Sequence, residues 1–216
     1  MVCRPGRQPD RSDERESVVV RGLRHRLVYL AVALLAGCAP ASRHSDVPAY
    51  VQLQALDADL RSHDSATLTL EHWCADHHLA EPPRIVARRL RDTEKPLPDE
   101  LRAQLALDAD EPIAYRHVQL VCGDHVFSEA DNWYVPGRLA PEMNRQLATT
   151  DEPFGKVVRP LGFQRRTLAA QILWNPAQRP DMPRDVLRHT AVLYTSAQLP
   201  FSAVIETYQN GLFESR

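Results

Sequence analysis

The sequence predicts an α+β domain in which an antiparallel sheet of about five to six strands has helices packed on one side. Two observations support this class. Apolar residues recur at helical spacing between residues 52 and 78, and the stretches from residue 113 onward alternate or are rich in residues typical of strands. Short turns of glycine, proline and aspartate separate the later strands, so we expect successive strands to form antiparallel hairpins.

The first part of the domain is expected to be mainly helical. Leu53, Leu56 and Leu60 recur at the spacing of one helix face. Asp99 can cap a later helix, because its carboxylate would lie at the positive end of the helix dipole. The expected elements are helices over residues 52–62 and 66–78, a half-buried strand over residues 84–92, and a short helix from Asp99 to about residue 107.

The second part is expected to supply most of the sheet. Cys122, Gly123 and Asp124 predict a tight turn between two strongly β-rich stretches. The expected strands are residues 113–121, 125–135, 164–174, 186–196 and 200–208, with helical segments over residues 139–148 and 156–160.

Composition limits the classes of function. The chain has 216 residues, of which 44% are hydrophobic, enough for one domain with a single core. Its net charge of −2 argues against a protein that holds a phosphate backbone by excess basic charge. The arginines cluster only in short groups diluted by acidic neighbours, which indicates a solvated face: Arg88, Arg89 and Arg91, then Arg165 and Arg166. We expect no nucleic-acid partner and a monomeric chain.

The N-terminus predicts an export signal. A basic segment precedes an apolar run over residues 27–37, which is too short to cross a bilayer. The run ends in Leu35-Ala36-Gly37-Cys38, which resembles the cleavage box of bacterial lipoproteins and implies a membrane anchor through lipid on Cys38. An uncleaved signal anchor, or a chance apolar stretch ahead of a mis-called start, remains an alternative. Val18-Val19-Val20 raise a separate hypothesis, in which a valine codon is the true start and the signal peptide is shorter. The expected organisation is a signal over residues 1–38, a tether over 39–47 and one domain over 48–216.

The cysteines give two further expectations. No pair has C-x-x-C spacing, which disfavours a zinc ribbon. Cys74 and Cys122 lie in apolar stretches, where they are expected as buried thiols or, if the domain is exported, as a disulfide. His72 and Asp76 are four residues apart and can share a helix face, but a metal would need ligands from elsewhere. We expect a polar helix end, no metal and no cofactor.

Four segments carry a resemblance to a known family. They are Tyr115–Asp124, an arginine-led strand with a glycine-aspartate turn; Phe127–Pro136, a strand ending in Val-Pro; Thr150–Lys156, a T-x-P-[LF]-G-like loop; and Leu199–Tyr208, a last strand with an inward glutamate. In this order and spacing they resemble the chorismate pyruvate-lyase family over residues 50–210. The resemblance implies a chorismate lyase-like fold, which ligand-sensing domains of bacterial transcription regulators share.

The resemblance also implies a site. The matched Arg116 would bind the substrate carboxylate with two parallel hydrogen bonds, and Glu206 would bond the ring hydroxyl. Both would be catalytic, while the backbone of Phe154 and Gly155 would help to hold the ligand. The implied reaction splits chorismate into 4-hydroxybenzoate, a ubiquinone precursor, and pyruvate, by positioning and electrostatics. From the residues alone, a glutamate in such an apolar strand can exchange a proton with a ligand.

One position departs from that family. Its best-known proteobacterial members carry a second arginine where this chain has Asn132, so a second carboxylate clamp is lost or replaced by an amide. Two alternatives to the lyase therefore stay open: an envelope lipoprotein that binds a small aromatic carboxylate without converting it, and a structural envelope lipoprotein. The signal implies a cell-envelope location facing the periplasm, or the cytoplasm if the signal is not used.

Overall fold

The computed structural model describes residues 46–91 and 94–214. The signal, its cleavage box and Cys38 lie outside these residues, so those expectations stay predictions. These residues cluster as one compact unit. Among the described residues, no helix has the length and apolar character needed to cross a membrane.

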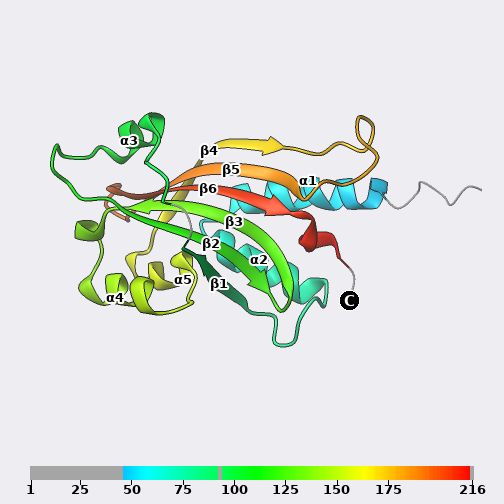
Figure 1. Ribbon diagram of the computed structural model, residues 1–216, viewed down its shortest axis with the longest axis horizontal. Coiled ribbons are helices and arrows are strands. Elements are labelled where there is room, and N and C mark those ends of the chain that lie inside the picture. The colour runs from blue at the N-terminus through cyan, green and yellow to red at the C-terminus, as the bar shows by residue number, and fades with distance from the viewer. Residues whose placement is uncertain (1–45, 92–93, 215–216) are drawn as a thin grey trace, which may run out of the picture. The chain divides into compact units, whose positions relative to one another are not determined.

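A six-stranded antiparallel sheet forms the centre of this unit, with the strand order β1-β2-β3-β6-β5-β4 (Figure 1). The predicted α+β class and antiparallel sheet are confirmed. The strands are β1 (Ile85–Leu90), β2 (Ala114–Cys122), β3 (His125–Tyr134), β4 (Gln164–Ile172), β5 (Asp185–Tyr194) and β6 (Pro200–Gln209). The helices are α1 (Asp46–Ser62), α2 (Ala66–Asp76), α3 (Asp99–Leu105), α4 (Pro141–Thr149) and α5 (Phe154–Val157).

The β2–β3 hairpin turns where the sequence predicts it. Gly123 has a φ of +56°, a left-handed conformation that side chains other than glycine's seldom adopt. A Cβ atom at this position would also come within 2.9 Å of the Ala80 Cβ. Both facts require glycine, and the turn fixes the register that places Arg116 opposite Asn132.

The main core fills the space between the sheet and helices α1 and α2. Leu53, Leu56 and Leu60 of α1 are fully buried there, as their spacing predicts. Ser65 caps α2, with its hydroxyl accepting a hydrogen bond from the Leu68 N–H at 3.3 Å. Because α2 begins under the sheet, its first turn reaches the interior of the domain.

The other face of the sheet is also covered in part, by α3. Leu101 and Leu105 of this helix pack with Trp133 and Val192 in a second, smaller cluster. The sequence places all helices on one side, and α3 corrects that detail because its leucines face apolar side chains on the opposite sheet face. The predicted cap also differs: Pro98 is the N-cap, and Asp99 lies in the first turn.

A disulfide joins Cys74 of α2 to Cys122 at the end of β2, with a Cα–Cα distance of 6.4 Å. This separation is within the range that disulfides span. Both cysteines are fully buried. Of the two alternatives drawn from the sequence, the structure has the disulfide.

Candidate functional site

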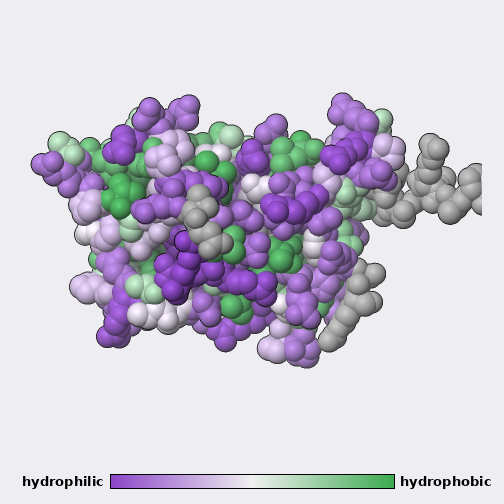
Figure 2. Space-filling view, in the orientation of Figure 1, coloured by the Kyte–Doolittle hydropathy of each residue, from purple (hydrophilic) through white to green (hydrophobic). Residues whose placement is uncertain are grey.

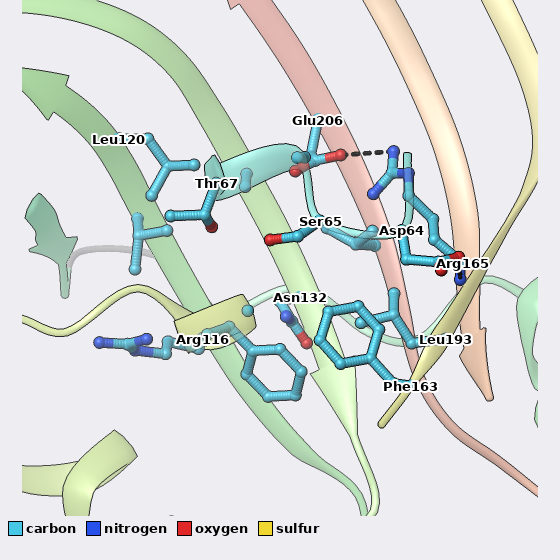
Figure 3. A pocket seen from close by; sticks show the side chains of 16 residues that line it. Asp64, Ser65, Thr67, Arg116, Leu120, Asn132, Phe163, Arg165, Leu193 and Glu206 are labelled. Carbon is cyan, nitrogen blue, oxygen red and sulfur yellow. Dashed lines mark hydrogen bonds and ion pairs between the residues drawn. The ribbon is translucent and has the colours of Figure 1, made fainter. Parts of the chain in front are cut away.

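A partly open pocket lies between the helix-covered face of the sheet and the first turn of α2 (Figure 3). The pocket has a volume of about 50 Å³, which leaves room for a few water molecules or a small organic ligand. The walls come from the α1–α2 loop, from α5 and from five strands. The lining residues are Asp64, Ser65, Ala66, Thr67, Arg116, Val118, Leu120, Ala130, Asn132, Phe154, Gly155, Phe163, Arg165, Leu193, Val204 and Glu206.

Most of the pocket wall is apolar. The rings of Phe154 and Phe163 lie on one side, and both pack near Phe201 with centroid distances of 6.3 Å. Leu193 and Leu120 close other sides (Figure 3). Such walls favour a ligand with an apolar body, and polar groups at a few points fix its orientation.

A buried ion pair forms the polar end of the pocket. Arg165 of β4 donates from Nη2 to Glu206 Oε2 of β6 at 2.7 Å, and the two side chains are only 3% and 7% exposed (Figure 3). Burial opposes the charge on Arg165, but Glu206 outweighs that effect and the pKa of Arg165 is raised. Arg165 therefore stays charged, and its charge is directed at the Glu206 carboxylate.

Tyr208 is a second hydrogen-bond donor to Glu206. Its hydroxyl donates to Glu206 Oε2 at 3.1 Å, and burial, together with the charge of Glu206, raises the pKa of Tyr208 well above its ordinary value. Tyr208 thus stays a donor. Both hydrogen bonds fall on Oε2, and no residue in the described part of the chain bonds Oε1 of Glu206. That oxygen can accept a hydrogen bond from a ligand.

Asn132 supplies donors on the neighbouring strand. The Ser202 hydroxyl donates to its Oδ1 at 2.9 Å, which leaves the amide N–H groups for a ligand. Asn132 is 5% exposed and lies between the aromatic rings and Glu206 (Figure 3). A hydrogen-bond acceptor, Glu206 Oε1, and a donor, the Asn132 amide, therefore lie on the same wall of the pocket.

Gly155 brings α5 against the first turn of α2. A Cβ atom there would meet Thr67 Oγ1 at 3.2 Å, which is tighter than an ordinary contact, and Ser65 Oγ at 3.4 Å. The small residue lets these hydroxyls approach the pocket wall. The predicted role of its backbone as a hydrogen-bond donor to the ligand stays a prediction.

Arg116 lines the pocket, but its guanidinium points away from Asn132 and Glu206 (Figure 3). Nη1 and Nη2 donate to the carbonyl oxygen of Glu152, both at 3.1 Å, and Nη2 also donates to that of Thr150. Burial lowers the pKa of Arg116 to about 10, and the neighbouring Arg89 adds to the effect. The charged end thus braces the loop that leads into α5.

A second buried polar pair lies beside the first. His189 of β5 is opposite Glu206 in the sheet register, and its Nε2 lies 2.8 Å from Asp57 Oδ1 of α1. Burial lowers the pKa of His189, although Asp57 opposes the shift. The histidine links α1 to the strand next to the pocket, but it is fully buried and does not line the cavity.

We expect His189 to make the domain less stable in mild acid. Burial holds the folded-state pKa of His189 below its ordinary value, so the unfolded chain binds the proton more readily. Stability is therefore full above about pH 6.5 and is lost as pH falls from there towards the folded-state pKa. Thermal melts of the full chain between pH 5 and 8 should show a shallower acid slope for His189→Gln. Equal slopes in both proteins would contradict this assignment.

Sequence reasoning missed Arg165, which it assigned to a solvated face. That prediction is wrong because β4 turns this side chain inward to meet Glu206, whereas Arg166 lies on the ring of Tyr194 at 4.4 Å. The alternation of side chains along the strand could have indicated this, because Arg165 and Arg166 must face opposite sides of the sheet. Among the residues described, no group of three histidine, cysteine or acidic side chains is arranged to hold a metal.

Comparison with known proteins gives one close relative. No family model matches the chain. The uncharacterized protein y4mC from Sinorhizobium fredii is 45% identical over an alignment of 191 residues, and the match covers 81% of this chain and 81% of y4mC.

Solved structures with a detectable likeness have low sequence identity. They include a possible transcriptional regulator, YydK, from Bacillus subtilis (15% identity, TM-score 0.40, covering 61% of this chain) and a GntR-family transcriptional regulator from Enterococcus faecalis (14%, 0.41, covering 60% of this chain and 97% of the regulator). Another is the effector domain of PhnF from Mycobacterium smegmatis (13%, 0.40, covering 62% and 88%). The match spans 60% of YydK, less than two thirds of its length.

These findings correct three predictions. The similar structures are regulators of transcription or an effector domain, not lyases, so the predicted chorismate cleavage and the link to ubiquinone synthesis are wrong. The roles predicted for Arg116 and Glu206 are not tested by these comparisons and stay predictions. The exclusion of nucleic acid from the partners is withdrawn because regulators are among the similar proteins, and no comparison supports a membrane anchor. The geometry adds a physical reason: Arg116 grips backbone carbonyls and Glu206 is already paired.

Proposed function

We propose that this chain, which belongs to the same protein family as y4mC of Sinorhizobium fredii, is a small-molecule-binding domain that holds its ligand in the pocket beside α2 without converting it. The observation that carries the proposal is Oε1 of Glu206, which no residue in the described part of the chain bonds, in a largely apolar pocket. A carboxylate oxygen in such a pocket favours a ligand that donates a hydrogen bond to it.

The charges of the pocket indicate a neutral ligand. Glu206 is compensated by Arg165, and the guanidinium of Arg116 is directed to the loop carbonyls. A further charge between these groups would meet no opposite partner, and burying an unpaired charge is expensive. Asn132, Phe154, Gly155 and Glu206 are the residues that we assign to ligand contact. The ligand class is a small molecule with a hydroxyl group on an apolar body.

Phenol and its methyl ether, anisole, test the proposal as a matched pair. We expect the full chain to bind phenol saturably, with shifts of the Leu193 and Val204 methyl signals in NMR spectra, because both residues line the pocket. Anisole cannot donate to Glu206, and leaving that acceptor unbonded should weaken binding about tenfold. Ala130→Leu should remove binding, because Ala130 lines the cavity and a larger side chain fills it.

The control variant is Ala169→Leu, since Ala169 lies exposed on β4 away from the pocket. It should bind phenol as the unchanged chain does. Equal affinity for phenol and anisole would contradict the role of Glu206, and binding that survives Ala130→Leu would show that phenol binds elsewhere.

The disulfide supports a location. Disulfides persist in oxidising compartments such as the bacterial periplasm and are rare in the cytosol. The Cys74–Cys122 bond therefore favours export of the domain, which agrees with the predicted signal at residues 1–38. We include a periplasm-facing location in the proposal on this ground.

A further inference from the structure

Arg116 differs from the other buried arginines in having no carboxylate as a hydrogen-bond partner among the described residues. Arg165 is paired with Glu206, and Arg138 is paired with Glu111. Arg116 is 2% exposed, yet over residues 46–91 and 94–214 it bonds only the carbonyl oxygens of Thr150 and Glu152. Its Nε is buried and has no hydrogen-bond partner there. Carbonyl dipoles satisfy donors but carry no net charge, and the nearby carboxylate of Asp151 acts on Arg116 only through space. The buried cation therefore has no ion-pair partner among the described residues, which is an unfavourable state.

The guanidinium of Arg116 lies beside a second hollow. This outer hollow, of about 250 Å³, opens at the sheet edge where β2 continues past the end of β1. Arg116 lines both the outer hollow and the inner pocket, and so forms part of the wall between them. Arg89 and Arg91 line the outer hollow as well. Figure 2 shows strongly hydrophilic side chains gathered around this end of β1.

The charges around the outer hollow are mainly positive. Three arginines line it, Arg89, Arg91 and Arg116, against one carboxylate, Glu94. Arg89 donates from Nη1 to the Ala148 carbonyl oxygen at 2.8 Å, again a backbone group. His117, at the rim, is held by Glu129 at 2.9 Å on the opposite sheet face. Arg89 and Arg116 are thus positioned by backbone carbonyls and keep their charge for another partner.

We propose that the outer hollow at the end of β1 is an oxyanion site, in which Arg89, Arg91 and Arg116 bind a phosphate, sulfate or carboxylate group. Guanidinium groups bind such groups through charge-assisted hydrogen bonds, and the planar fork of donors fits two oxygens at once. The anion supplies the charge that Arg116 lacks. The site is distinct from the inner pocket and does not depend on what that pocket holds.

Inorganic phosphate tests the site directly. The full chain, labelled with ¹⁵N, is titrated with phosphate at constant ionic strength, with chloride as the balancing anion. We expect saturable shifts of the Nε–H signals of Arg89, Arg91 and Arg116. Arg91→Gln removes one exposed arginine that does not line the inner pocket, and should weaken phosphate binding about fivefold.

Arg159→Gln is the matched control, because Arg159 is exposed on a short helical turn and lines neither cavity. It should leave phosphate binding unchanged. An Arg116 signal that does not move with phosphate would overturn the proposal. So would equal weakening by Arg91→Gln and Arg159→Gln, which would indicate diffuse attraction to the surface. Phenol binding is measured separately, so either proposal can fail while the other stands.

Discussion

Replacing Arg165 by methionine is expected to lower the free energy of unfolding by about 3–5 kcal/mol, because the change leaves the buried carboxylate of Glu206 without its cation. The two side chains are nearly inaccessible, so water cannot take the place of the guanidinium. The double variant Arg165→Met/Glu206→Gln removes both charges and should recover most of the loss. Urea denaturation of the full chain measures all three proteins.

The exposed pair Arg145–Glu142 provides the control. Its side chains are 71% and 51% exposed, so Arg145→Met should leave the unfolding midpoint unchanged. A small effect of Arg165→Met would contradict the buried pair. A double variant as unstable as the single one would show that Arg165 acts through packing and not through Glu206.

Loss of the Cys74–Cys122 disulfide is the second large effect, expected at about 2–4 kcal/mol. The bond closes a loop between residues 48 positions apart, and the cross-link restricts the unfolded chain. The variant Cys74→Ala/Cys122→Ala should therefore unfold at lower urea than the oxidised chain. Thiol titration of the denatured, unreduced chain should detect Cys3 and Cys38 but neither cysteine of the bond.

Reduction of the unchanged protein offers a comparison for that variant. Reduced protein and the double alanine variant should have similar stability, since both lack the cross-link. If the oxidised chain and the variant unfold at the same urea concentration, the bond does not stabilise the fold. If all four cysteines react in the unreduced chain, the bond does not form.

The sheet could be predicted well from the sequence because its signals are local. The turn at Gly123 and the β-rich stretches on either side specify a hairpin without any long-range information. The start of α1 could not be placed, since the helix begins at Asp46, seven residues before Leu53, the first of the leucines whose spacing marks its buried face. Likewise, Leu101 and Leu105 show that α3 is amphipathic, but not which sheet face it covers.

The site could be predicted only in part. The sequence predicts site residues on β2, β3 and β6, namely Arg116, Asn132 and Glu206, and all three line the same pocket. Their partners were not found, because they come from elements distant in the chain. Arg165 is 41 residues from Glu206, and the carbonyl that Arg116 bonds most closely is 36 residues away. Those contacts set the direction of the Arg116 guanidinium. That direction determines whether an anion bound by Arg116 would lie in the inner pocket or in the outer hollow.

A crystal structure of the full chain soaked with 4-bromophenol would test the binding function most directly. The bromine gives an anomalous signal that locates the ligand independently of the protein model. We predict one strong peak inside the pocket, with the ring between Phe154 and Leu193 and the hydroxyl group within hydrogen-bond distance of Glu206 Oε1. An empty pocket at saturating ligand, or a bromine peak only on the outer surface, would contradict the proposed small-molecule-binding function.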